Sequence, residues 1–323
     1  MKLELCAELS ASHNGSLDRA LEIVEAAANA GATHFKLQTW SPGRMCVDRR
    51  YTVKRGPWRG RPLAEMYEQA WTPWDWHPVI FDYARVKKLT PFSAAFDRES
   101  VDFLEVLGVD RHKVASFEAT DLPLIRYMAS KGKPILLSTG MASRQEVAAA
   151  VEACNGLAIP LACTSTYPAD PAAARIADFA DCWAMWGLSD HTLGIGTAVA
   201  AATLGACYIE KHLTLDRGDG GLDCGFSMEP KEFKAMADAC KQAVAATGVS
   251  RGNPKESTEL RRSLWVIMDT PAGCPLRLYQ NVDTARPELG LPPSTDLTGK
   301  VAARPLRAGT PLTKDDIHDP RPT

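Results

Sequence analysis

The sequence has no long run of basic residues, no apolar stretch of membrane-spanning length and no cysteines paired as CxxC. Its 37 basic and 39 acidic side chains leave a formal net charge of −2. Nucleic-acid-binding surfaces need clustered Lys and Arg, so no nucleic acid partner is expected. The longest apolar stretches, such as 195–209, are interrupted by Gly and Thr and are too short to cross a bilayer, so no membrane partner is expected.

The start of the chain, Met-Lys-Leu-Glu-Leu-Cys, lacks the features of a signal peptide. The nine cysteines are an odd number without the spacing of a disulfide framework, which is typical of reduced thiols. A hydrophobic content of 45% with 24% charged residues is typical of a globular chain and excludes wholesale disorder. We therefore expect a cytoplasmic globular protein.

Short β-rich segments alternate with helical segments through most of the chain. The predicted strands are 3–9, 33–39, 90–96, 113–116, 134–139, 157–165, 185–191 and 207–214. The predicted helices are 17–30, 74–88, 98–107, 122–130, 144–154, 171–182, 195–204 and 230–246. This alternation over roughly 250 residues predicts an α/β fold, the (β/α)8 TIM barrel. A doubly wound open sheet is the alternative, because periodicity does not distinguish a closed sheet from an open one.

Three of these helices begin with recognisable capping residues. Ser16 and Asp97 precede the first residues of their helices, where a side-chain oxygen can accept from a free backbone N–H. Ser143 and Glu146 have the spacing of a capping box. These signals support the predicted helix starts.

Two parts of the sequence depart from the alternation. The segment 40–72 has no clear period and contains several Pro and Gly residues, so we expect a long loop with a functional role. After residue 246 a polar stretch leads into short β-like runs punctuated by Pro and Gly. We predict a TIM-barrel catalytic domain over 1–247, a linker over 248–263 and a small β-rich domain over 264–323.

Polar side chains lie at or near the predicted carboxyl ends of all eight strands, where TIM barrels carry their active sites. They are Glu8, Lys36 with Gln38, Ser93, Lys113 with Ser116 and Glu118, Ser138, Ser165 with Tyr167, Ser189 with His191, and His212. Any one of them alone is more often an ordinary polar residue at a strand end. Their convergence on one end of a barrel predicts an active site there.

The residue types indicate which chemistry this site supports. Two lysines with serine hydroxyls and backbone amides form a receptacle for a phosphorylated anion. His191 and His212 suit a divalent metal acting as a Lewis acid, although two hydrogen-bonded core histidines are the alternative. Glu8 and Glu118 can orient a polyhydroxylated substrate or transfer a proton. The residues thus predict a metal-assisted reaction between a phosphate-bearing anion and a neutral polar partner.

Ordered motifs along the chain resemble those of the sialic acid synthase family. They are AELSASHNGSL at 7–17, FKLQT at 35–39, KVAS at 113–116, LSTGM at 137–141, CTSTYP at 163–168, GLSDHT at 187–192 and EKHLT at 210–214. The C-terminal motifs ARP at 285–287, GK at 299–300 and TKDDI at 313–317 are similar to the family's SAF (antifreeze-like) domain. The resemblance covers nearly the whole chain.

Two regions resemble one branch of that family, the pseudaminic acid synthases. They are GPWRGR at 56–61 with MYEQAWTPWDWH at 66–77, and RGDGGLD at 217–223 with FSMEP at 226–230. Synthases for N-acetylneuraminate are less similar in both places. The branch resemblance implies that the acceptor is a 2,4-diacetamido-2,4,6-trideoxyhexose.

The family resemblance implies a transferase that condenses phosphoenolpyruvate (PEP) with an acylamino sugar aldehyde, giving a nonulosonic acid and phosphate. It implies that Mn²⁺, or Mg²⁺ or Co²⁺, is held by His191 and His212. The implied catalytic residues are Glu8, Glu118, His191 and His212. The implied PEP ligands are Lys36, Ser93, Lys113, Ser116, Ser138, Ser165 and Ser189. The implied sugar contacts are Glu8, Glu118, Tyr167, Asp223 and Arg286, the last reaching a partner subunit's active site in a domain-swapped homodimer.

Three positions differ from the family pattern. Ser12 stands where Asn is usual, Ala94 replaces an expected hydroxyl residue, and Glu288 follows Arg286-Pro287 where Gly is common. Losing one neutral hydrogen bond at Ala94 costs about 0.5–1.5 kcal/mol, which weakens binding without abolishing the chemistry. Two alternatives therefore stand beside the leading hypothesis. One is an N-acetylneuraminate or legionaminic acid synthase that uses an N-acetylmannosamine-type sugar, and the other is an inactive sugar-binding relative.

Overall fold

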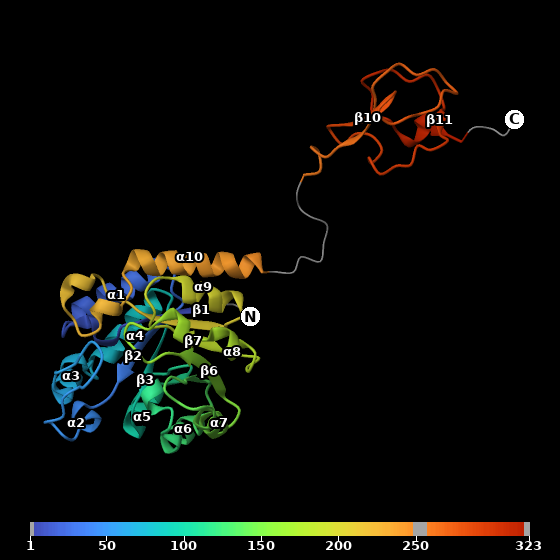
Figure 1. Cartoon of the computed structure of the whole chain (residues 1–323). Helices are drawn as coiled ribbons and strands as arrows, with labels where there is room; N and C mark the ends of the chain where they lie inside the picture. The colour runs from blue at the N-terminus through green and yellow to red at the C-terminus, as the bar shows by residue number, and fades with distance from the viewer. Residues whose placement is uncertain (1–2, 248–256, 320–323) are drawn as a thin grey trace. The chain divides into compact units, whose positions relative to one another are not determined.

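A computed structural model of the chain describes residues 3–247 and 257–319. The chain divides into two compact units, Met1–Gly248 and Val249–Thr323 (Figure 1). Each unit has its own hydrophobic core. Within the linker predicted at 248–263, residues 248–256 lie outside the described part of the chain.

The first unit is a closed barrel of eight parallel strands in the order β1 to β8. The strands are β1 (Glu4–Glu8), β2 (His34–Thr39), β3 (Thr90–Ala95), β4 (His112–Val114), β5 (Ile135–Ser138), β6 (Ala158–Cys163), β7 (Gly187–Ser189) and β8 (Tyr208–His212). Strand β1 pairs with both β2 and β8, which closes the sheet. The predicted TIM barrel is therefore confirmed, and the open-sheet alternative is wrong.

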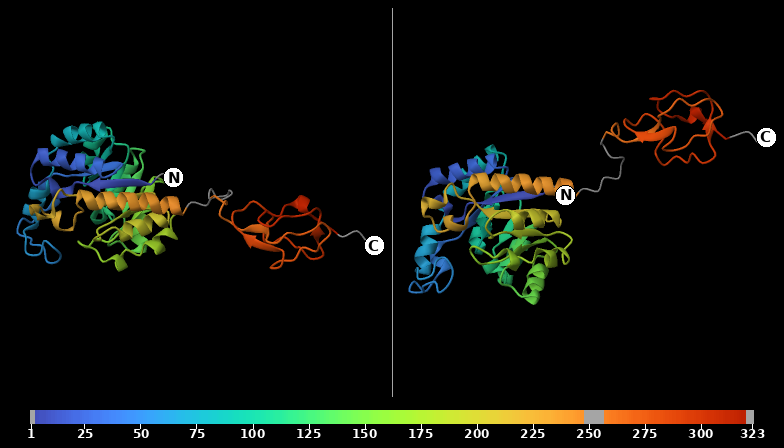
Figure 2. Two further views of the ribbon diagram at one scale, coloured as in Figure 1. Left: turned by 90° about the horizontal axis from the view of Figure 1, so that it is seen from above. Right: turned by 45° about the horizontal axis from the view of Figure 1, so that its top comes forward.

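Helices surround the barrel and follow its strands. They are α1 (Leu17–Asn29), α2 (Pro42–Met45), α3 (Leu63–Ala70), α4 (Trp76–Val86), α5 (Arg98–Val106), α6 (Leu122–Ala129), α7 (Arg144–Ala153), α8 (Ile176–Ala180), α9 (Gly196–Thr203) and α10 (Pro230–Ala246). Helix α10 lies along the outside of the barrel beside α1 and α9 (Figure 2). Short 3₁₀ turns occupy several of the loops: η1 (Ser10–His13), η2 (Ser116–Glu118), η3 (Pro171–Ala173), η4 (Arg217–Asp219) and η5 (Cys224–Phe226).

The predicted capping residues hold the starts of three helices. The backbone N–H of Arg19 donates to Ser16 Oγ at 3.2 Å. The backbone N–H of Ser100 donates to Asp97 Oδ1 at 2.7 Å. Ser143 and its partner three residues on form both halves of a capping box at the start of α7. Each contact satisfies a backbone donor that the helix itself leaves free.

Two predicted segments differ from the structure. The expected loop 40–72 contains α2 and α3, and the apolar spacing of Leu63, Met66 and Tyr67 is the helical signal within it. The helix predicted at 171–182 is broken into η3 and α8. The break falls at Arg175, whose left-handed backbone (φ 44°) cannot continue a right-handed helix.

The barrel interior is closed at one end and polar at the other. On β2, Phe35 belongs to the apolar layer between strands and helices, whereas Lys36 lines the interior. Below Lys36, the rings of His34, Phe92 and Tyr208 meet edge to face with centroids 6.2–6.5 Å apart. This aromatic layer fills the amino-terminal end, and the main cavity of the barrel lies at the carboxyl ends of the strands.

The second unit contains two small antiparallel sheets. They are formed by β9 (Ser263–Val266) with β10 (Val282–Ala285), and by β11 (Val301–Ala302) with β12 (Ile317–His318), which η6 (Lys314–Asp316) precedes. The core of the unit contains Leu264, Val282 and Leu312. A Cβ atom at Gly290 would lie 2.3 Å from the carbonyl oxygen of Leu264, so only glycine lets these backbones approach.

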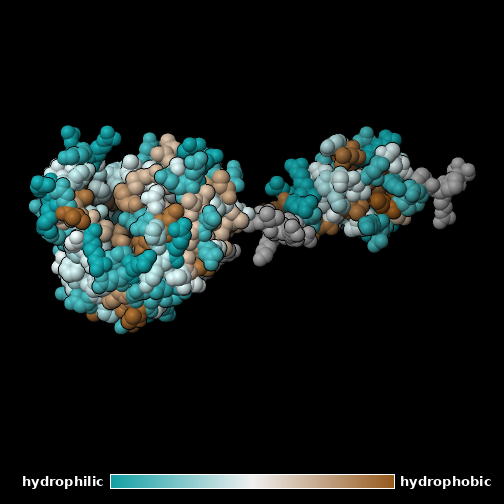
Figure 3. All heavy atoms as spheres, turned by 90° about the horizontal axis from the view of Figure 1, so that it is seen from below, coloured by the Kyte–Doolittle hydropathy of each residue, from teal (hydrophilic) through white to brown (hydrophobic). Residues whose placement is uncertain are grey.

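The described residues include no helix long and apolar enough to span a membrane. The face of the molecule turned to the viewer in Figure 3 is mostly hydrophilic, with hydrophobic residues in small separate groups. Isolated surface hydrophobic residues of this kind are normal for a folded domain.

Gly187 on β7 offers a test of how tightly the barrel is packed. An added Cβ would lie 2.6 Å from the carbonyl oxygen of Tyr208 and 2.7 Å from Cδ2 of Leu161. We predict that Gly187→Ala lowers the free energy of unfolding of the barrel unit by about 1–3 kcal/mol, because the backbone of β8 must shift. Urea denaturation followed by circular dichroism measures the change.

The matched control is Gly196→Ala at the start of α9, where no atom lies within 4 Å of the added Cβ. Alanine is the better helix former, so this variant should unfold at the same urea concentration or a slightly higher one. Equal stability of the two variants would contradict the tight packing around Gly187.

Candidate active site

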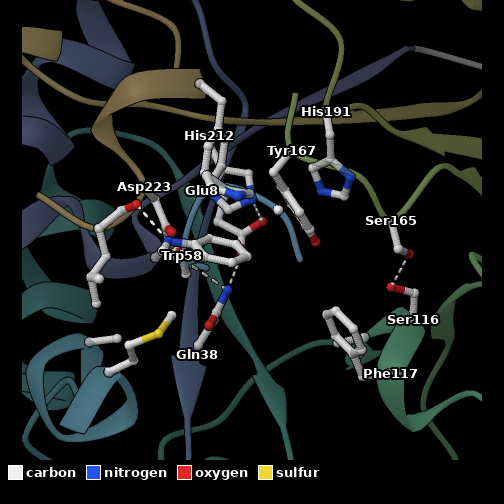
Figure 4. A pocket seen from close by; sticks show the side chains of 18 of the residues that line it. Glu8, Gln38, Trp58, Ser116, Phe117, Ser165, Tyr167, His191, His212 and Asp223 are labelled. Atoms are coloured by element: carbon white, nitrogen blue, oxygen red, sulfur yellow. Dashed lines mark hydrogen bonds and ion pairs between the residues drawn. The ribbon is translucent and has the colours of Figure 1, made fainter. Parts of the chain in front are cut away.

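A cavity of about 730 Å³ opens at the carboxyl ends of the barrel strands (Figure 4). Most of the predicted site residues line it: Glu8, Lys36, Lys113, Ser116, Ser138, Ser165, Tyr167, Ser189, His191, His212 and Asp223. Its volume lies within the usual range for small-molecule sites, about 300–1,000 Å³. Residues from strands that are far apart in the chain therefore meet in this one cavity, as the sequence analysis predicted.

The floor of the cavity is a buried network of two lysines and two carboxylates. Lys36 Nζ lies 2.7 Å from Glu8 Oε1 and 3.8 Å from Glu210 Oε1. Lys113 Nζ lies 3.4 Å from the same Glu210 oxygen and donates to Ser138 Oγ at 2.7 Å. All four charged side chains are buried. Two ammonium groups are thus fixed side by side under the cavity.

Glu210 links this floor to the neighbouring strand β7 and to a second residue of its own strand, β8. Its carboxylate accepts hydrogen bonds from Ser189 Oγ and from the Tyr208 hydroxyl, each at 2.7 Å. The sequence prediction omitted Glu210 from the site. The signal was present, because Glu210 precedes His212 by two residues on one strand and therefore shares its face.

The pairing keeps the floor residues ionised in spite of their burial. Burial alone would raise the pKa of Glu8, but the charges of Lys36 and His212 outweigh it and hold that pKa well below its usual range. Burial would likewise raise the pKa of Glu210, but the two lysines lower it. Burial lowers the pKa of Lys36, and the two carboxylates more than compensate, so its pKa is raised. Ion pairing therefore dominates over desolvation.

The two predicted histidines lie together beside this floor. The ring centroids of His191 and His212 are 5.5 Å apart. His191 Nδ1 lies 2.9 Å from the carbonyl oxygen of Thr164, which can only accept, so Nδ1 carries a proton and Nε2 is the nitrogen left to face a ligand. His212 Nε2 lies 3.6 Å from Glu8 Oε2. The imidazoles and the lysines are therefore on the same face of the barrel.

The donor set fits the divalent metal that the histidines were predicted to hold. Within residues 3–247 and 257–319, no group of three or more His, Cys, Asp or Glu side chains forms a complete metal cluster. Two imidazoles with Glu8 nearby nevertheless offer nitrogen and oxygen donors. The buried Nδ1 of His212 has no hydrogen-bond partner, and burial lowers the pKa of this ring, which favours the neutral form needed by a metal ligand.

Two serine hydroxyls line the cavity on the side of His191. Ser116 Oγ and Ser165 Oγ are 2.7 Å apart (Figure 4). A Cβ atom at Gly140 would lie 2.2 Å from Ser165 Oγ and 3.2 Å from Ser116 Cβ. Glycine is therefore required at 140 for these two hydroxyls to meet, a role that the sequence prediction missed.

Asp223 is tied to the first strand by a chain of hydrogen bonds. Ser10 Oγ donates to Asp223 Oδ2 at 2.5 Å. Gln38 Nε2 donates to Glu8 Oε1 at 2.6 Å and to Ser10 Oγ at 3.1 Å. Ser10 was not predicted as a site residue. It lies just after β1 with a left-handed backbone (φ 43°), which strand alternation does not anticipate.

The prediction that Ser93 binds PEP is wrong, because the structure places this residue outside the cavity. It pairs in register with Leu37, which points to the helices, whereas Ala94 pairs with the inward-facing Gln38. Ser93 Oγ lies 2.7 Å from Thr39 Oγ1 in the layer between barrel and helices. The prediction counted polar residues at the strand end without fixing the face on which each one lies.

Two other predicted residues do not line the cavity. Ser116 and Phe117 do, but Glu118 does not, because a 3₁₀ turn has three residues per turn and points successive side chains in different directions. Glu118 is largely buried, and its Oε2 has no hydrogen-bond partner. Arg286 is exposed on the second unit, so its predicted contact with a sugar stays a prediction.

The long segment 40–72 supplies a cavity wall that the sequence did not assign to particular residues. Trp58, Met66 and Tyr67 line the cavity together with Tyr167 and Phe226. Only the Pro- and Gly-rich composition of this segment marked it as functional. The helical spacing of its apolar residues is confined to 63–70, and nothing in the pattern around Trp58 shows that this residue faces the cavity.

Burial raises the pKa of the Glu118 carboxyl to about 7, from an ordinary value of 4.5. A raised carboxyl pKa stabilises the folded state below the unfolded-state pKa, and that stabilisation is lost as the pH rises through the folded-state value. We predict that the unfolding free energy of the wild type, relative to Glu118→Gln, falls by about 3 kcal/mol between pH 4.5 and pH 7. Urea denaturation at a series of pH values measures this difference.

Glu65→Gln, at an exposed position of α3, is the control for loss of one carboxylate. The difference in unfolding free energy between the wild type and Glu65→Gln should stay constant between pH 4.5 and pH 7. If the difference in unfolding free energy between the wild type and Glu118→Gln is also constant over this pH range, the Glu118 carboxyl is not held in its neutral form.

Comparison with known proteins places this geometry in a family. Residues 23–252 match the NeuB family, and residues 262–318 match the SAF domain. The chain is 38% identical to the pseudaminic acid synthase of Helicobacter pylori, with 97% of each chain covered. It is 32% identical to the N,N'-diacetyllegionaminic acid synthase of Legionella pneumophila, with 97% of this chain and 94% of that one covered.

A solved structure agrees with the fold. The crystal structure of N-acetylneuraminic acid synthetase from Leptospira borgpetersenii, in complex with citrate, superposes with a TM-score of 0.71 at 26% identity. The superposition covers 79% of this chain and 88% of that one. The predicted resemblance is confirmed: this chain is a member of the NeuB family with a C-terminal SAF domain.

Proposed function

We propose that this protein is a nonulosonic acid synthase of the pseudaminic acid type, which condenses PEP with a 2,4-diacetamido-2,4,6-trideoxyhexose and releases phosphate. The observation that carries the proposal is the meeting of two buried lysines and two imidazoles in one cavity. The identity to a pseudaminic acid synthase is higher than to a legionaminic acid synthase, which supports the branch.

The anion site lies between the lysines and the serine side of the cavity. Lys36 and Lys113 supply the positive charge, and the hydroxyls of Ser138, Ser165 and Ser189 supply neutral donors to phosphate and carboxylate oxygens. Because carboxylates already neutralise both lysines, an entering anion competes with Glu8 and Glu210 for their N–H groups. The site thus exchanges one set of ionic hydrogen bonds for another.

The neighbouring histidines define where the sugar aldehyde binds. The enol carbon of PEP attacks the carbonyl carbon, water adds to the resulting cationic carbon, and that tetrahedral centre expels phosphate. The protein's part is to hold the two carbons in contact and to exclude bulk water. Glu8, which lies between Lys36 and His212, is the group placed to orient the sugar or to move a proton.

A divalent cation, most suitably Mn²⁺, is part of this proposal. His191 and His212 would hold it, and it would act as a Lewis acid on the sugar carbonyl. Nε2 of His191, which is left to face a ligand, and the partnerless Nδ1 of His212 support this assignment. Asp223 and Tyr167 then lie on the sugar's side of the cavity.

The second unit completes the proposed enzyme as a dimer. Arg286 is exposed on the second unit, so its guanidinium is accessible to a ligand. In the proposed domain-swapped homodimer it binds the sugar's amide in the partner's cavity. A cytoplasmic location accompanies this proposal as an expectation from the sequence.

The test of the function is phosphate release from PEP by the purified protein with Mn²⁺ and each of two sugars. We expect turnover with the 2,4-diacetamido-2,4,6-trideoxyhexose to exceed that with N-acetylmannosamine by at least about 100-fold, since several polar groups differ. Mass spectrometry of the keto acid identifies the product. His212→Ala and removal of metal by a chelator should each abolish release.

Three outcomes separate the alternatives. Preference for N-acetylmannosamine would replace the pseudaminic branch by the N-acetylneuraminate branch, and preference for the legionaminic precursor would favour that relative. Tight sugar binding without phosphate release from any acceptor would identify an inactive sugar-binding protein.

Ser138 and Ser93 provide a matched pair for the anion site. Both are buried serines at strand ends, but only Ser138 lines the cavity and contacts Lys113. We predict that Ser138→Ala raises the KM for PEP by roughly 2–12-fold, which corresponds to one neutral hydrogen bond. Ser93→Ala should change this KM by less than twofold. Equal effects of the two substitutions would contradict the assigned faces.

A further inference from the structure

Trp58 covers part of the cavity although it comes from a segment that is otherwise exposed. Residues 54–57 and 59–60 on either side of it are exposed, whereas the indole is half-buried and lines the cavity (Figure 4). Its ring centroid lies 5.3 Å from that of Tyr167 and 5.9 Å from that of Phe226. These three rings, which we call the aromatic wall, are also in mutual contact, since Tyr167 and Phe226 are 5.0 Å apart.

The only hydrogen-bonding atom of the indole is already engaged. Its one polar atom, Nε1, donates a hydrogen bond to the carbonyl oxygen of Leu222 at 2.9 Å. That bond fixes the ring against the loop after β8 and removes the N–H from use by a ligand. A hydroxyl group placed against this ring would lose hydrogen bonds to water and gain none.

The aromatic wall joins the histidines to Trp58. Tyr167 lies 4.3 Å from His191, and Phe226 lies 5.3 Å from His212, between ring centroids. Trp58 contacts Tyr167 and Phe226, and within the described residues no ring contact joins it directly to either histidine. An acceptor whose carbonyl lies at the histidines therefore extends its carbon chain along these rings, with its far end at the indole.

We propose that Trp58 determines acceptor specificity by favouring a methyl group over a hydroxymethyl group at the far end of the sugar. The inference rests on the proposed function, because it takes the histidines as the site of the sugar carbonyl. It adds a role that the proposed chemistry of the lysines and histidines does not require, since within the described residues no hydrogen bond or ring contact joins Trp58 to those side chains. It also gives the long segment between β2 and β3 a purpose.

The experiment uses the full-length protein and two acceptors that differ at one carbon. They are the 2,4-diacetamido-2,4,6-trideoxyhexose and the same sugar with a hydroxyl on carbon 6. The wild type should prefer the deoxy sugar by roughly 10–100-fold in kcat/KM, because an apolar surface rejects an added hydroxyl only to that extent. Trp58→Ala should reduce the preference to about threefold or less, mainly by weakening turnover of the deoxy sugar.

Two controls keep the result interpretable. Arg59→Ala changes the neighbouring exposed residue, which does not line the cavity, and should leave the preference unchanged. Trp58→Phe keeps an apolar ring and should retain most of the preference although it lacks the hydrogen bond to Leu222. Binding of PEP alone, followed by calorimetry, shows that each variant keeps an intact anion site.

The outcomes distinguish this inference from the function on which it rests. If the wild type turns over neither sugar, the proposed function fails. If the wild type prefers the deoxy sugar and Trp58→Ala slows both sugars by the same factor, the function stands and the specificity role is overturned. A wild type that uses both sugars equally also overturns it.

Discussion

The site depends on the buried contact of Glu210 with the two lysines of the barrel floor. A lone ammonium group in this position would be strongly destabilised, because transfer from water into a protein interior costs several kcal/mol per ion. Glu210 is within 4 Å of both Lys36 and Lys113, and Glu8 takes the second contact to Lys36. The carboxylates thus keep two cations together in a place where their mutual repulsion would otherwise separate them.

The same strand that carries Glu210 also places one of the histidines. On β8 the alternation sends Glu210 and His212 inward and Lys211 outward, where Lys211 Nζ lies 2.8 Å from Asp190 Oδ2. Asp190 precedes His191, so this buried ion pair joins the two residues next to the histidines. The spacing of the imidazoles inside the barrel is therefore set partly by a salt bridge outside it, and alternation along two strands makes that possible.

Much of the fold could be predicted because its signals are local. Strand and helix alternate regularly, and capping residues such as Ser143 mark helix starts, so the barrel followed from the order of elements. The site residues at the carboxyl ends of the strands could be predicted, because these ends meet at one end of a barrel. Ser93 was misplaced because its face depends on register with β2, and Glu118 because a turn of three residues redirects it. Trp58 was not singled out, because its contacts join segments more than 100 residues apart in the chain, which no local pattern reports.

The cavity combines two surfaces of opposite character, and they come from different parts of the fold. Strand residues make the ionic floor, whose geometry the closed sheet holds rigidly. The segment after β2 and the loops after β6 and β8 make the aromatic wall, with Trp58, Tyr167 and Phe226. A charged substrate such as PEP needs fixed charges of opposite sign around it. A sugar substrate with acyl and methyl groups needs apolar surface to contact. The histidines contact both surfaces, so in the proposed function the barrel can preserve the chemistry while the loops set which sugar is accepted.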